Sequence, residues 1–307
     1  MKKDLIIINN EKCIKKGNNF YCENLEIKSI TELLSKTFNV KLILRRSVVR
    51  PVHKINNSEI VTSSNIFSFI KNIVYTVIKD KGNYLIISVT PYTLLSFLFL
   101  LLSKKKMFLY LRSDGKKEIA VIFGKKISII YKMVENIMVK FCDLIVVNNL
   151  ISKKKKFYLV NPSQIDEEWF EDIKMSQRNT IKLLYIGRLK IEKGVHSLIN
   201  IFEKIQYSEK NILLTLIGLG NKLRNTSNKI RFLDPISIKK DLIKQYDQHD
   251  IFILPSFTEG HPQVLLESLV RQRPVVVFEE IEHVLQKYEG VFVCKRDHNH
   301  LLNLIKF

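Results

Sequence analysis

A chain of 307 residues exceeds the size of most single hydrophobic cores, so its length favours two domains. Its composition, 46% hydrophobic and 26% charged residues, excludes an extensively disordered protein. The net charge of +20 is uneven, because residues 1–160 carry 29 basic and 11 acidic residues whereas residues 161–307 carry 21 and 19. A basic first half predicts an anionic partner, such as a lipid surface.

Apolar β-type runs alternate with helical patterns along the whole chain. Strands are predicted over residues 4–8, 41–44, 84–89, 107–111 and 144–147, and then over 182–186, 212–217, 230–232, 251–254 and 274–278. Helices are predicted over residues 24–37, 65–79, 92–103, 126–140, 194–205, 238–246 and 262–271. This alternation is typical of α/β proteins with doubly wound parallel sheets.

Residues 82–103 carry no charge and are numerous enough to span a bilayer. Pro91 favours a different interpretation, in which a buried strand precedes the proline and a helix follows it. Such an apolar helix, followed by Lys104, Lys105 and Lys106, is also suited to docking on a membrane surface.

Asn161, Pro162 and Ser163, followed by the acidic residues 166–172, mark a linker at the change in charge balance. We therefore expect two Rossmann-like domains, 1–164 and 165–307, facing each other across a cleft. Open α/β sheets bind ligands at the carboxyl ends of their strands, so the chemistry is expected there.

Other features restrict the class of protein. The four cysteines form no CxxC pair and have no histidine cluster beside them, so reduced thiols and no metal site are expected. The apolar stretch at the N-terminus is too short for a signal peptide, which favours a cytoplasmic protein. The basic half lacks an aromatic–basic RNA signature and a helix-turn-helix pattern, so no nucleic-acid partner is expected.

The first chemical motif is LLYIGRLKIEKG, residues 183–194. An apolar strand ends at Gly187, and Arg188 and Lys193 follow before a helix begins at Gly194. An arginine fork and a lysine ammonium at a strand end can hold a diphosphate, although both can equally be solvated loop cations.

The second motif is DIFILPSFTEGHPQVLLES, residues 250–268. Pro262 suits the first position of a helix, whose free amides at Gln263, Val264 and Leu265 would then bind phosphate. Glu259 and Glu267 flank this helix start, where sugar hydroxyls of a bound ligand would lie.

Together these motifs resemble the retaining glycosyltransferases of family 4, the glycosyl transferases group 1, which have the two-domain GT-B fold. The similarity rests on GRLKIEKG (187–194), LTLIGLG (214–220) and DIFILPSFTEGHPQVLLESLVRQRPVVV (250–277), and extends over residues 180–290. The first half resembles the family only in its general architecture. It contains only Gly17 within residues 9–18, where members usually have a glycine-rich loop.

The resemblance implies a role for each matching residue. Arg188 and Lys193 would hold the donor diphosphate, Glu259 would contact the transferred sugar, and Glu267 would bind the ribose. The remaining donor-binding residues implied by the family pattern are Gly187, Gly218, Gly260, His261, Pro262, Gln263, Val264 and Leu265. The segment after strand 107–111 resembles the acceptor side of the family, which implies Arg112 and Asp114 as weaker candidates.

The implied activity is transfer of a hexose from a nucleotide-sugar to a glycan or lipid-linked acceptor, in the synthesis of a cell-surface polysaccharide or lipopolysaccharide. Retention is expected to proceed by front-face attack assisted by the donor phosphate, because retaining members of this fold lack an obvious nucleophile. Cations and helix amides stabilise the departing diphosphate, so no metal and no cofactor are expected. The basic first half would hold the enzyme on the anionic inner face of the cell membrane.

Two alternatives remain open from the sequence. A nucleotide-sugar 2-epimerase would use the same donor site without an acceptor. Family members also continue for several elements beyond the equivalent of residue 293, so a short, truncated or inactive transferase is the other alternative.

Overall fold

The computed structural model describes residues 2–48, 53–56, 58–149, 151, 156–174, 180–208, 211–220, 227–284 and 288–306. Its internal contacts divide the chain into two units. The first comprises Met1–Gly115 and Ile129–Asn161, and the second comprises Lys116–Ser128 and Pro162–Phe307. The sequence-based boundary follows residue 164, whereas the contacts divide the chain after Asn161.

The first unit contains a nine-stranded sheet within the described residues. Its strands are β1 (Lys3–Lys16), β2 (Asn19–Cys22), β3 (Phe38–Arg46), β4 (His53–Ile55), β5 (Glu59–Ser63), β6 (Asn83–Ile87), β7 (Met107–Leu111), β8 (Asp143–Val146) and β9 (Tyr158–Leu159). The parallel strands lie in the order β5-β3-β1-β6-β7-β8-β9, so the direction of winding reverses between β1 and β6. The predicted doubly wound arrangement is therefore confirmed for this unit.

Strand β1 is much longer than the predicted strand at residues 4–8. The register with β3 shifts between Ile8 and Lys12, where the side-chain oxygen of Asn9 accepts a 2.6 Å hydrogen bond from the amide of Glu11. Beyond this irregularity, β1 forms an antiparallel hairpin with β2, turning at Gly17 with a φ of +57°. A hairpin of residues 13–22 thus overlaps residues 9–18, where members of the family usually have a glycine-rich loop.

The structure describes five helices between β2 and β8 along the chain, and the first three begin with local capping signals. They are α1 (Leu25–Ser35), α2 (Ile66–Lys79), α3 (Pro91–Leu102), α4 (Gly115–Phe123) and α5 (Lys125–Phe141). Thr90 and Thr93 form a reciprocal capping box at the start of α3, with Pro91 in its first turn. The strand–helix interpretation of residues 82–103 is therefore confirmed, and α4 is an additional helix that the sequence patterns did not reveal. None of the helices that the structure describes is long and apolar enough to cross a membrane.

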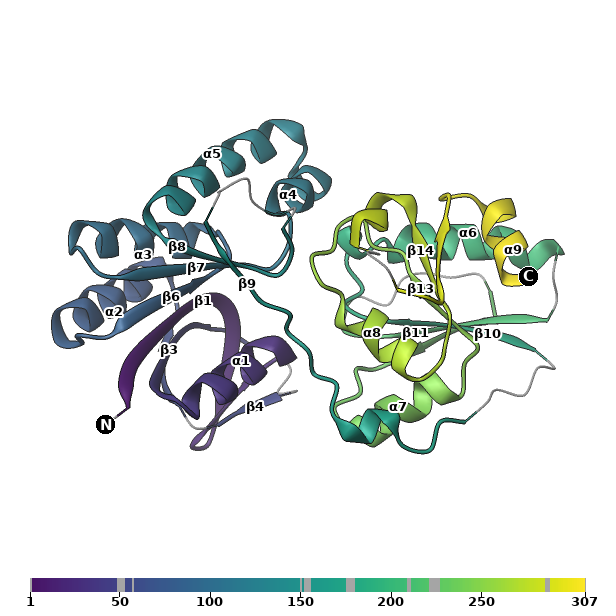
Figure 1. Ribbon diagram of the computed structural model, residues 1–307, viewed down its shortest axis with the longest axis horizontal. Coiled ribbons are helices and arrows are strands. Elements are labelled where there is room, and N and C mark those ends of the chain that lie inside the picture. The colour runs from purple at the N-terminus through teal and green to yellow at the C-terminus, as the bar shows by residue number, and fades with distance from the viewer. Residues whose placement is uncertain are drawn as a thin grey trace. The chain divides into compact units, whose positions relative to one another are not determined.

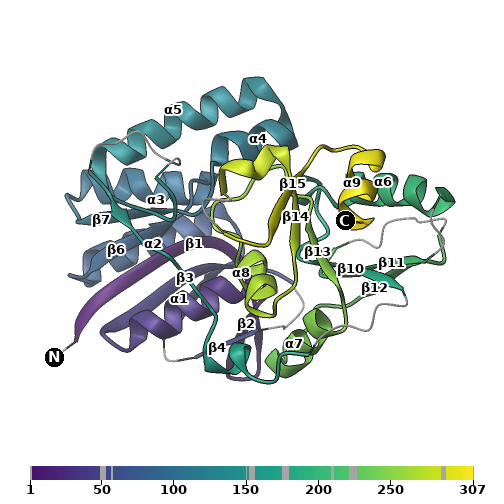
Figure 2. The ribbon, with the colours of Figure 1, turned by 45° about the vertical axis from the view of Figure 1, so that its right-hand side comes forward.

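Both faces of the first sheet are covered by helices. Helix α1 lies on one side, and α3 and α5 lie on the other (Figures 1 and 2). The strands supply a continuous buried core in which Ile7, Leu42 and Ile86 are fully enclosed. Such uninterrupted apolar runs are characteristic of parallel strands buried on both faces.

The second unit contains a six-stranded, all-parallel sheet within the described residues. Its strands are β10 (Ile181–Ile186), β11 (Ile212–Ile217), β12 (Ile230–Leu233), β13 (Ile251–Leu254), β14 (Val275–Phe278) and β15 (Val291–Cys294). They lie in the order β12-β11-β10-β13-β14-β15, which is the Rossmann order 3-2-1-4-5-6. The strand order reverses between β10 and β13, the position where open α/β sheets bind ligands.

Successive residues of β10 face opposite sides of this second sheet. Leu183 and Tyr185 belong to the core beneath α6 (Val195–Ser208) and α9 (His298–Lys306). Leu184 belongs instead to the core beneath α7 (Lys239–Asp247) and α8 (Gln263–Val270). Figures 1 and 2 show these two helix pairs on opposite sides of the sheet. Three 3₁₀ turns complete the described elements: Glu167–Phe170, Ile191–Lys193 and Glu279–Val284.

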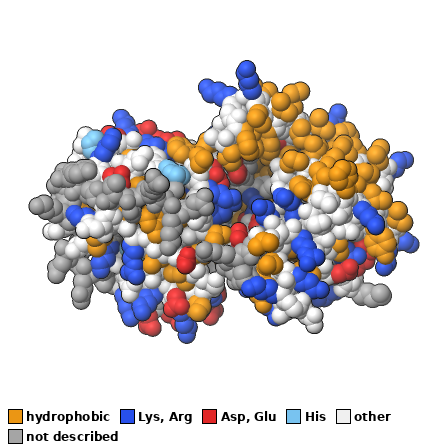
Figure 3. Space-filling view, turned by 180° about the vertical axis from the view of Figure 1, so that it is seen from behind, with side chains coloured by type: hydrophobic (Ala, Val, Ile, Leu, Met, Phe, Trp, Pro, Cys, Tyr) orange, Lys and Arg blue, Asp and Glu red, His pale blue; other side chains and the backbone are white. Residues whose placement is uncertain are grey.

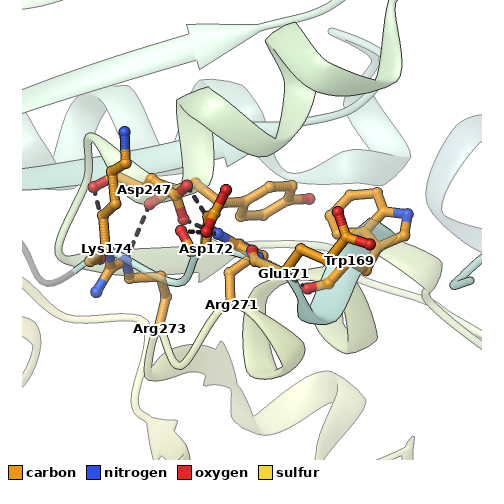
Figure 4. Close-up of polar contacts among 8 residues, drawn as sticks. Trp169, Glu171, Asp172, Lys174, Asp247, Arg271 and Arg273 are labelled. Carbon is orange, nitrogen blue, oxygen red and sulfur yellow. Dashed lines mark hydrogen bonds and ion pairs between the residues drawn. The ribbon is translucent and has the colours of Figure 1, made fainter. Parts of the chain in front are cut away.

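Two buried arginines fix the linker segment to the second unit (Figure 4). The Arg271 guanidinium is 1% exposed, forms a bidentate pair with Asp247 at 2.9 and 2.8 Å, and donates to the carbonyls of Trp169, Glu171 and Asp172. Arg273 donates to the carbonyl of Lys174. The acidic stretch predicted as a linker is therefore held through its backbone by planar, multiply bonded cations.

Replacing Arg271 with lysine is expected to lower the free energy of unfolding by about 3 kcal/mol, because an ammonium cannot satisfy Asp247 and three carbonyls at once. Lys239→Ala is the matched control, because the partly exposed Lys239 pairs with Asp166 and Glu168 of the same segment. This loss should stay below about 1 kcal/mol. Urea unfolding measures both variants, and similar losses would contradict the assigned role of Arg271.

Candidate functional site

The two predicted motifs meet at the reversal of strand order in the second unit. Strands β10 and β13 pair directly, with Leu183 opposite Ile251 and Leu184 opposite Phe252. Gly187 follows the carboxyl end of β10, and Pro255 follows that of β13. Residues 187–194 and 255–262 therefore lie at the same edge of the same sheet.

Glycines allow the main chain to approach closely at this edge. A Cβ on Gly218 would lie 1.7 Å from the carbonyl oxygen of Gly187, so the chain segments after β10 and β11 touch. Gly194 has a φ of +67°, and a Cβ there would lie 1.9 Å from the carbonyl oxygen of Pro255. Any larger residue at either position would force these segments apart.

Lys193 and Glu259, which are 66 residues apart in sequence, form an ion pair in the structure. The Lys193 Nζ lies 2.6 Å from the Glu259 Oε1, and both side chains are largely buried. The Ser256 hydroxyl donates to the same carboxylate oxygen, also at 2.6 Å. Glu259 thus compensates the charge of Lys193, a pairing that the sequence motifs did not indicate.

Arg188 has a different environment. Its backbone carbonyl accepts a 2.8 Å hydrogen bond from the buried Tyr185 hydroxyl, which fixes the turn after β10. Its side chain is exposed and forms no ion pair with any residue that the structure describes. The guanidinium is therefore available to an anionic ligand.

The start of α8 differs in two respects from the prediction. Pro262 occupies the N-cap position instead of the first helical position, and the helix begins at Gln263. The Leu265 amide is not free, because it donates to the Pro262 carbonyl at 3.2 Å, closing a tight first turn. The amides of Gln263 and Val264 donate to no described group and remain open to a ligand.

The Gln263 side chain holds the linker instead of pointing to a free site. It donates to the Pro162 carbonyl, and its oxygen accepts a 3.1 Å hydrogen bond from the Gln164 amide. The neighbouring Gly260 is buried and His261 is partly buried. The Thr258 hydroxyl is buried and has no hydrogen-bond partner in the described part of the chain.

Glu267 is buried on α8 and accepts a 2.7 Å hydrogen bond from the Tyr246 hydroxyl. Burial raises the pKa of Glu267 from 4.5 to about 7, because removal from water penalises the carboxylate more than the Tyr246 hydrogen bond stabilises it. The carboxyl group can therefore be protonated near neutral pH. Tyr246 also packs against the indole ring of Trp169, with ring centroids 5.8 Å apart.

Arg296 is a residue of this region that the sequence motifs missed. Its guanidinium pairs with Glu280 at 2.7 Å, donates to the Pro255 carbonyl at 3.0 Å, and stacks on the Phe257 and Phe278 rings. It thereby supports the loop after β13. Its partners are distant along the chain, so no local sequence pattern could have revealed it.

The two acceptor-side candidates lie in the first unit. Arg112, just after β7, pairs with Glu26 in the first turn of α1 and donates to the Ser88 hydroxyl at 3.3 Å. Asp114 is partly buried, and its charge contributes to raising the pKa of Glu135. Arg112 therefore has structural partners within its own unit. The residues that the structure describes contain no cluster of His, Cys, Asp or Glu that could hold a metal ion.

The two α/β units have the GT-B fold expected from the sequence. HepE of Anabaena in complex with UDP-glucose has a TM-score of 0.70 and 12% identity, with 99% of this chain and 89% of that chain covered. Residues 180–306, in the second unit, match the model of the glycosyl transferases group 1. This segment is therefore similar to the glycosyl transferases group 1.

Two relatives that match in sequence are glycosyltransferases by name. An uncharacterized glycosyltransferase of Methanocaldococcus jannaschii is 26% identical over 215 residues, 62% of this chain and 52% of that protein. The capsular polysaccharide biosynthesis glycosyltransferase CapM of Staphylococcus aureus is 29% identical over 124 residues, 37% of this chain and 32% of that protein. The alignments thus span about half, or less, of the length of these relatives.

Gly194→Ala is expected to destabilise the second unit and to disturb the site. The left-handed backbone costs about 1–2 kcal/mol for alanine, and displacing the Pro255 carbonyl adds about 1–3 kcal/mol. Gly290→Ala is the matched control, because Gly290 is also left-handed but faces only the flexible Leu269 side chain at 3.3 Å. Equal losses in urea unfolding would show that the contact with Pro255 is unimportant.

The raised pKa of Glu267 predicts a pH dependence of stability. Between pH 4.5 and about 7 the folded protein binds more protons at this group than the unfolded chain, so stability falls as pH rises. The side chain introduced by Glu267→Gln is neutral at every pH, so this variant lacks the decline. The difference in unfolding free energy between Glu267→Gln and wild type should therefore grow in favour of the variant, by on the order of 3 kcal/mol from pH 4.5 to about 7.

Unfolding curves at several pH values measure this difference. Tyr246→Phe removes the hydrogen bond that lowers the pKa of Glu267, so the unfolding free energy of this variant should keep falling to a higher pH than that of wild type. Parallel pH profiles for wild type and Glu267→Gln would contradict the assignment.

Proposed function

We propose that the chain is a glycosyltransferase that moves a hexose from a nucleotide-sugar to a glycan or lipid-linked acceptor. The main support is the Lys193–Glu259 ion pair at the reversal of strand order in β10-β13, within the segment that matches the glycosyl transferases group 1. UDP-glucose in the complex of the structural neighbour HepE is consistent with a nucleotide-sugar donor.

In this proposal the donor diphosphate competes with Glu259 for Lys193. The exposed Arg188 supplies the second cation, and the open amides of Gln263 and Val264 donate to the phosphate oxygens. Releasing Lys193 frees Glu259 to accept hydrogen bonds from hydroxyls of the transferred sugar. Lys193 and Glu259 thus exchange their contact with each other for separate contacts with the diphosphate and with the sugar.

The reaction breaks the bond between the anomeric carbon and the donor phosphate oxygen, and forms a bond from that carbon to an acceptor hydroxyl oxygen. The acceptor proton passes to the departing phosphate, which is the front-face route to retention. Negative charge grows on the leaving diphosphate, where Arg188 and Lys193 stabilise it more strongly in the transition state than in the ground state. This chemistry requires neither a metal ion nor a cofactor.

Glu267 is proposed to bind the donor ribose. Its Tyr246-bound carboxyl lies on the second turn of α8, beyond the amides that would hold the phosphate. Because protonation near pH 7 removes one accepting oxygen, donor affinity should fall as pH drops below the pKa of Glu267.

The names of relatives such as CapM support a role in cell-surface polysaccharide or lipopolysaccharide synthesis. We place the enzyme in the cytoplasm, at the inner face of the membrane, because its basic first half is suited to anionic lipid. An acceptor linked to lipid would be reached there.

A thermal-shift screen with UDP-, GDP-, ADP- and CMP-sugars tests the donor site without knowledge of the acceptor. One class should raise the melting temperature of wild type. Glu267→Ala should weaken donor binding about tenfold, and Arg188→Ala should lower turnover about 100-fold with a smaller effect on binding.

Lys190→Ala is the matched control, because Lys190 is an exposed cation two residues from Arg188. Wild-type kinetics in Arg188→Ala and Glu267→Ala would refute the site. An epimerised nucleotide-sugar formed without acceptor would instead support the 2-epimerase alternative.

A further inference from the structure

Helix α5 has an unusual distribution of side chains. Its inward face carries Ser128, Glu135 and Met138, all buried. Its outward face carries Ile130, Met133, Ile137 and Phe141, which are 62, 63, 51 and 49% exposed. This outward stripe has helical spacing, so the arrangement is the reverse of an ordinary surface helix, in which the apolar stripe faces the core.

The buried carboxyl of Glu135 shows that α5 turns a charged residue, and not its apolar stripe, toward the core. Glu135 forms an ion pair with Lys132, and burial raises the pKa of Glu135 above its ordinary value. Met138 and Cys142 meanwhile pack into the core of the first unit. The orientation of α5 is therefore fixed by packing, and its apolar stripe necessarily points outward.

The apolar surface extends beyond this stripe. Phe141 contacts Phe97 of α3, with ring centroids 6.3 Å apart. Further exposed apolar side chains on α3 and α5 within the first unit are Leu98, Leu102 and Ile129. Figure 3 shows hydrophobic side chains gathered over this part of the molecule, with lysine and arginine at the margins. Contiguous apolar surface with a polar rim marks an interaction site.

The charge around this surface identifies the partner. Residues 91–142 contain ten basic and three acidic residues. None of the three acids is fully exposed: Glu135 is buried, and Asp114 and Glu118 are partly buried. Exposed lysines flank the stripe, with Lys125 and Lys126 at one end of α5 and Lys140 at the other. An apolar face with a lysine margin matches the boundary between headgroups and acyl chains in an anionic bilayer.

We propose that the outward face of α5 inserts into the interface of an anionic membrane, with Lys125, Lys126 and Lys140 on lipid phosphates. A second copy of the chain is a poorer partner, because pairing this face with itself would bring two sets of lysines together. The inference deepens the proposed function by naming the membrane-binding surface. The inference depends on the proposed function in one respect only: a lipid-linked acceptor is the reason for the enzyme to bind the membrane.

Sedimentation of the full-length chain with lipid vesicles tests the proposal. Vesicles of phosphatidylcholine with about 30% phosphatidylglycerol should bind the chain at least about tenfold more strongly than pure phosphatidylcholine, and added salt should weaken the binding. The double variant Met133→Asp/Ile137→Asp should reduce binding to the anionic vesicles at least about tenfold, because two charges would enter the acyl boundary.

Leu33→Asp is the matched control, since Leu33 on α1 is 63% exposed, like Met133, but lies outside this surface. It should bind vesicles as wild type does. The triple variant Lys125→Glu/Lys126→Glu/Lys140→Glu should lose the preference for anionic lipid. Wild-type binding by the double variant, or an equal loss in Leu33→Asp, would overturn the proposal.

Two further measurements separate this inference from the proposed function. Sedimentation velocity without lipid should show a monomer for wild type and the double variant; a wild-type dimer that the double variant dissociates would assign the face to self-association. The nucleotide-sugar thermal shift should be the same in wild type and the double variant. Vesicle binding without any change in melting temperature on adding nucleotide-sugars would support the membrane-binding surface and contradict the proposed transferase function.

Discussion

The direct pairing of β10 with β13 is the constraint on which the second unit depends. These strands begin 70 residues apart, at Ile181 and Ile251, and become neighbours only because the chain first winds in one direction through β11 and β12 and then returns. The return places two loops at one sheet edge. Gly194 against Pro255 and Gly218 against Gly187 then remove the side-chain volume that would separate the loops. The Lys193–Glu259 contact is a consequence of this packing.

Two carboxylates at this edge have contrasting environments. Glu259 is beside a cation and a hydroxyl, whereas buried Glu267 has the Tyr246 hydroxyl, and burial raises its pKa to about 7. Different environments allow similar groups to serve different purposes. In the proposed function, Glu259 responds to the arrival of a diphosphate, and Glu267 responds to pH.

The linker is structurally connected to the same region. Gln263, at the start of α8, binds the backbone near Pro162, while Arg271, just beyond its end, binds the backbone at residues 169–172. Tyr246 contacts both Glu267 and Trp169. Helix α8 is therefore held to the linker by hydrogen bonds near both of its ends.

The sequence by itself determined the alternation of strands and helices, the doubly wound class, and the two motifs around Arg188 and Glu259. These features depend on local periodicity, on the positions of glycine and proline, and on residues adjacent along the chain. Residues 84–89 and 92–103 could be assigned as strand and helix because Pro91 and its threonine cap act within a single turn. Helix α4 and the hairpin continuing β1 lacked comparable local signals.

Only the tertiary structure decided which charges meet and which faces stay exposed. Lys193 could be assigned to a strand-end loop, but its pairing with Glu259 depends on strand order, and Arg296 depends on three segments that converge. Helix α5 is the clearest case: its amphipathic pattern predicts a helix, and an ordinary interpretation would bury the stripe at Ile130, Met133 and Ile137. The structure instead buries Glu135 and Met138 and leaves the stripe outside. Periodicity indicates which residues share a face of a helix, whereas the packing of distant segments decides which face meets the core.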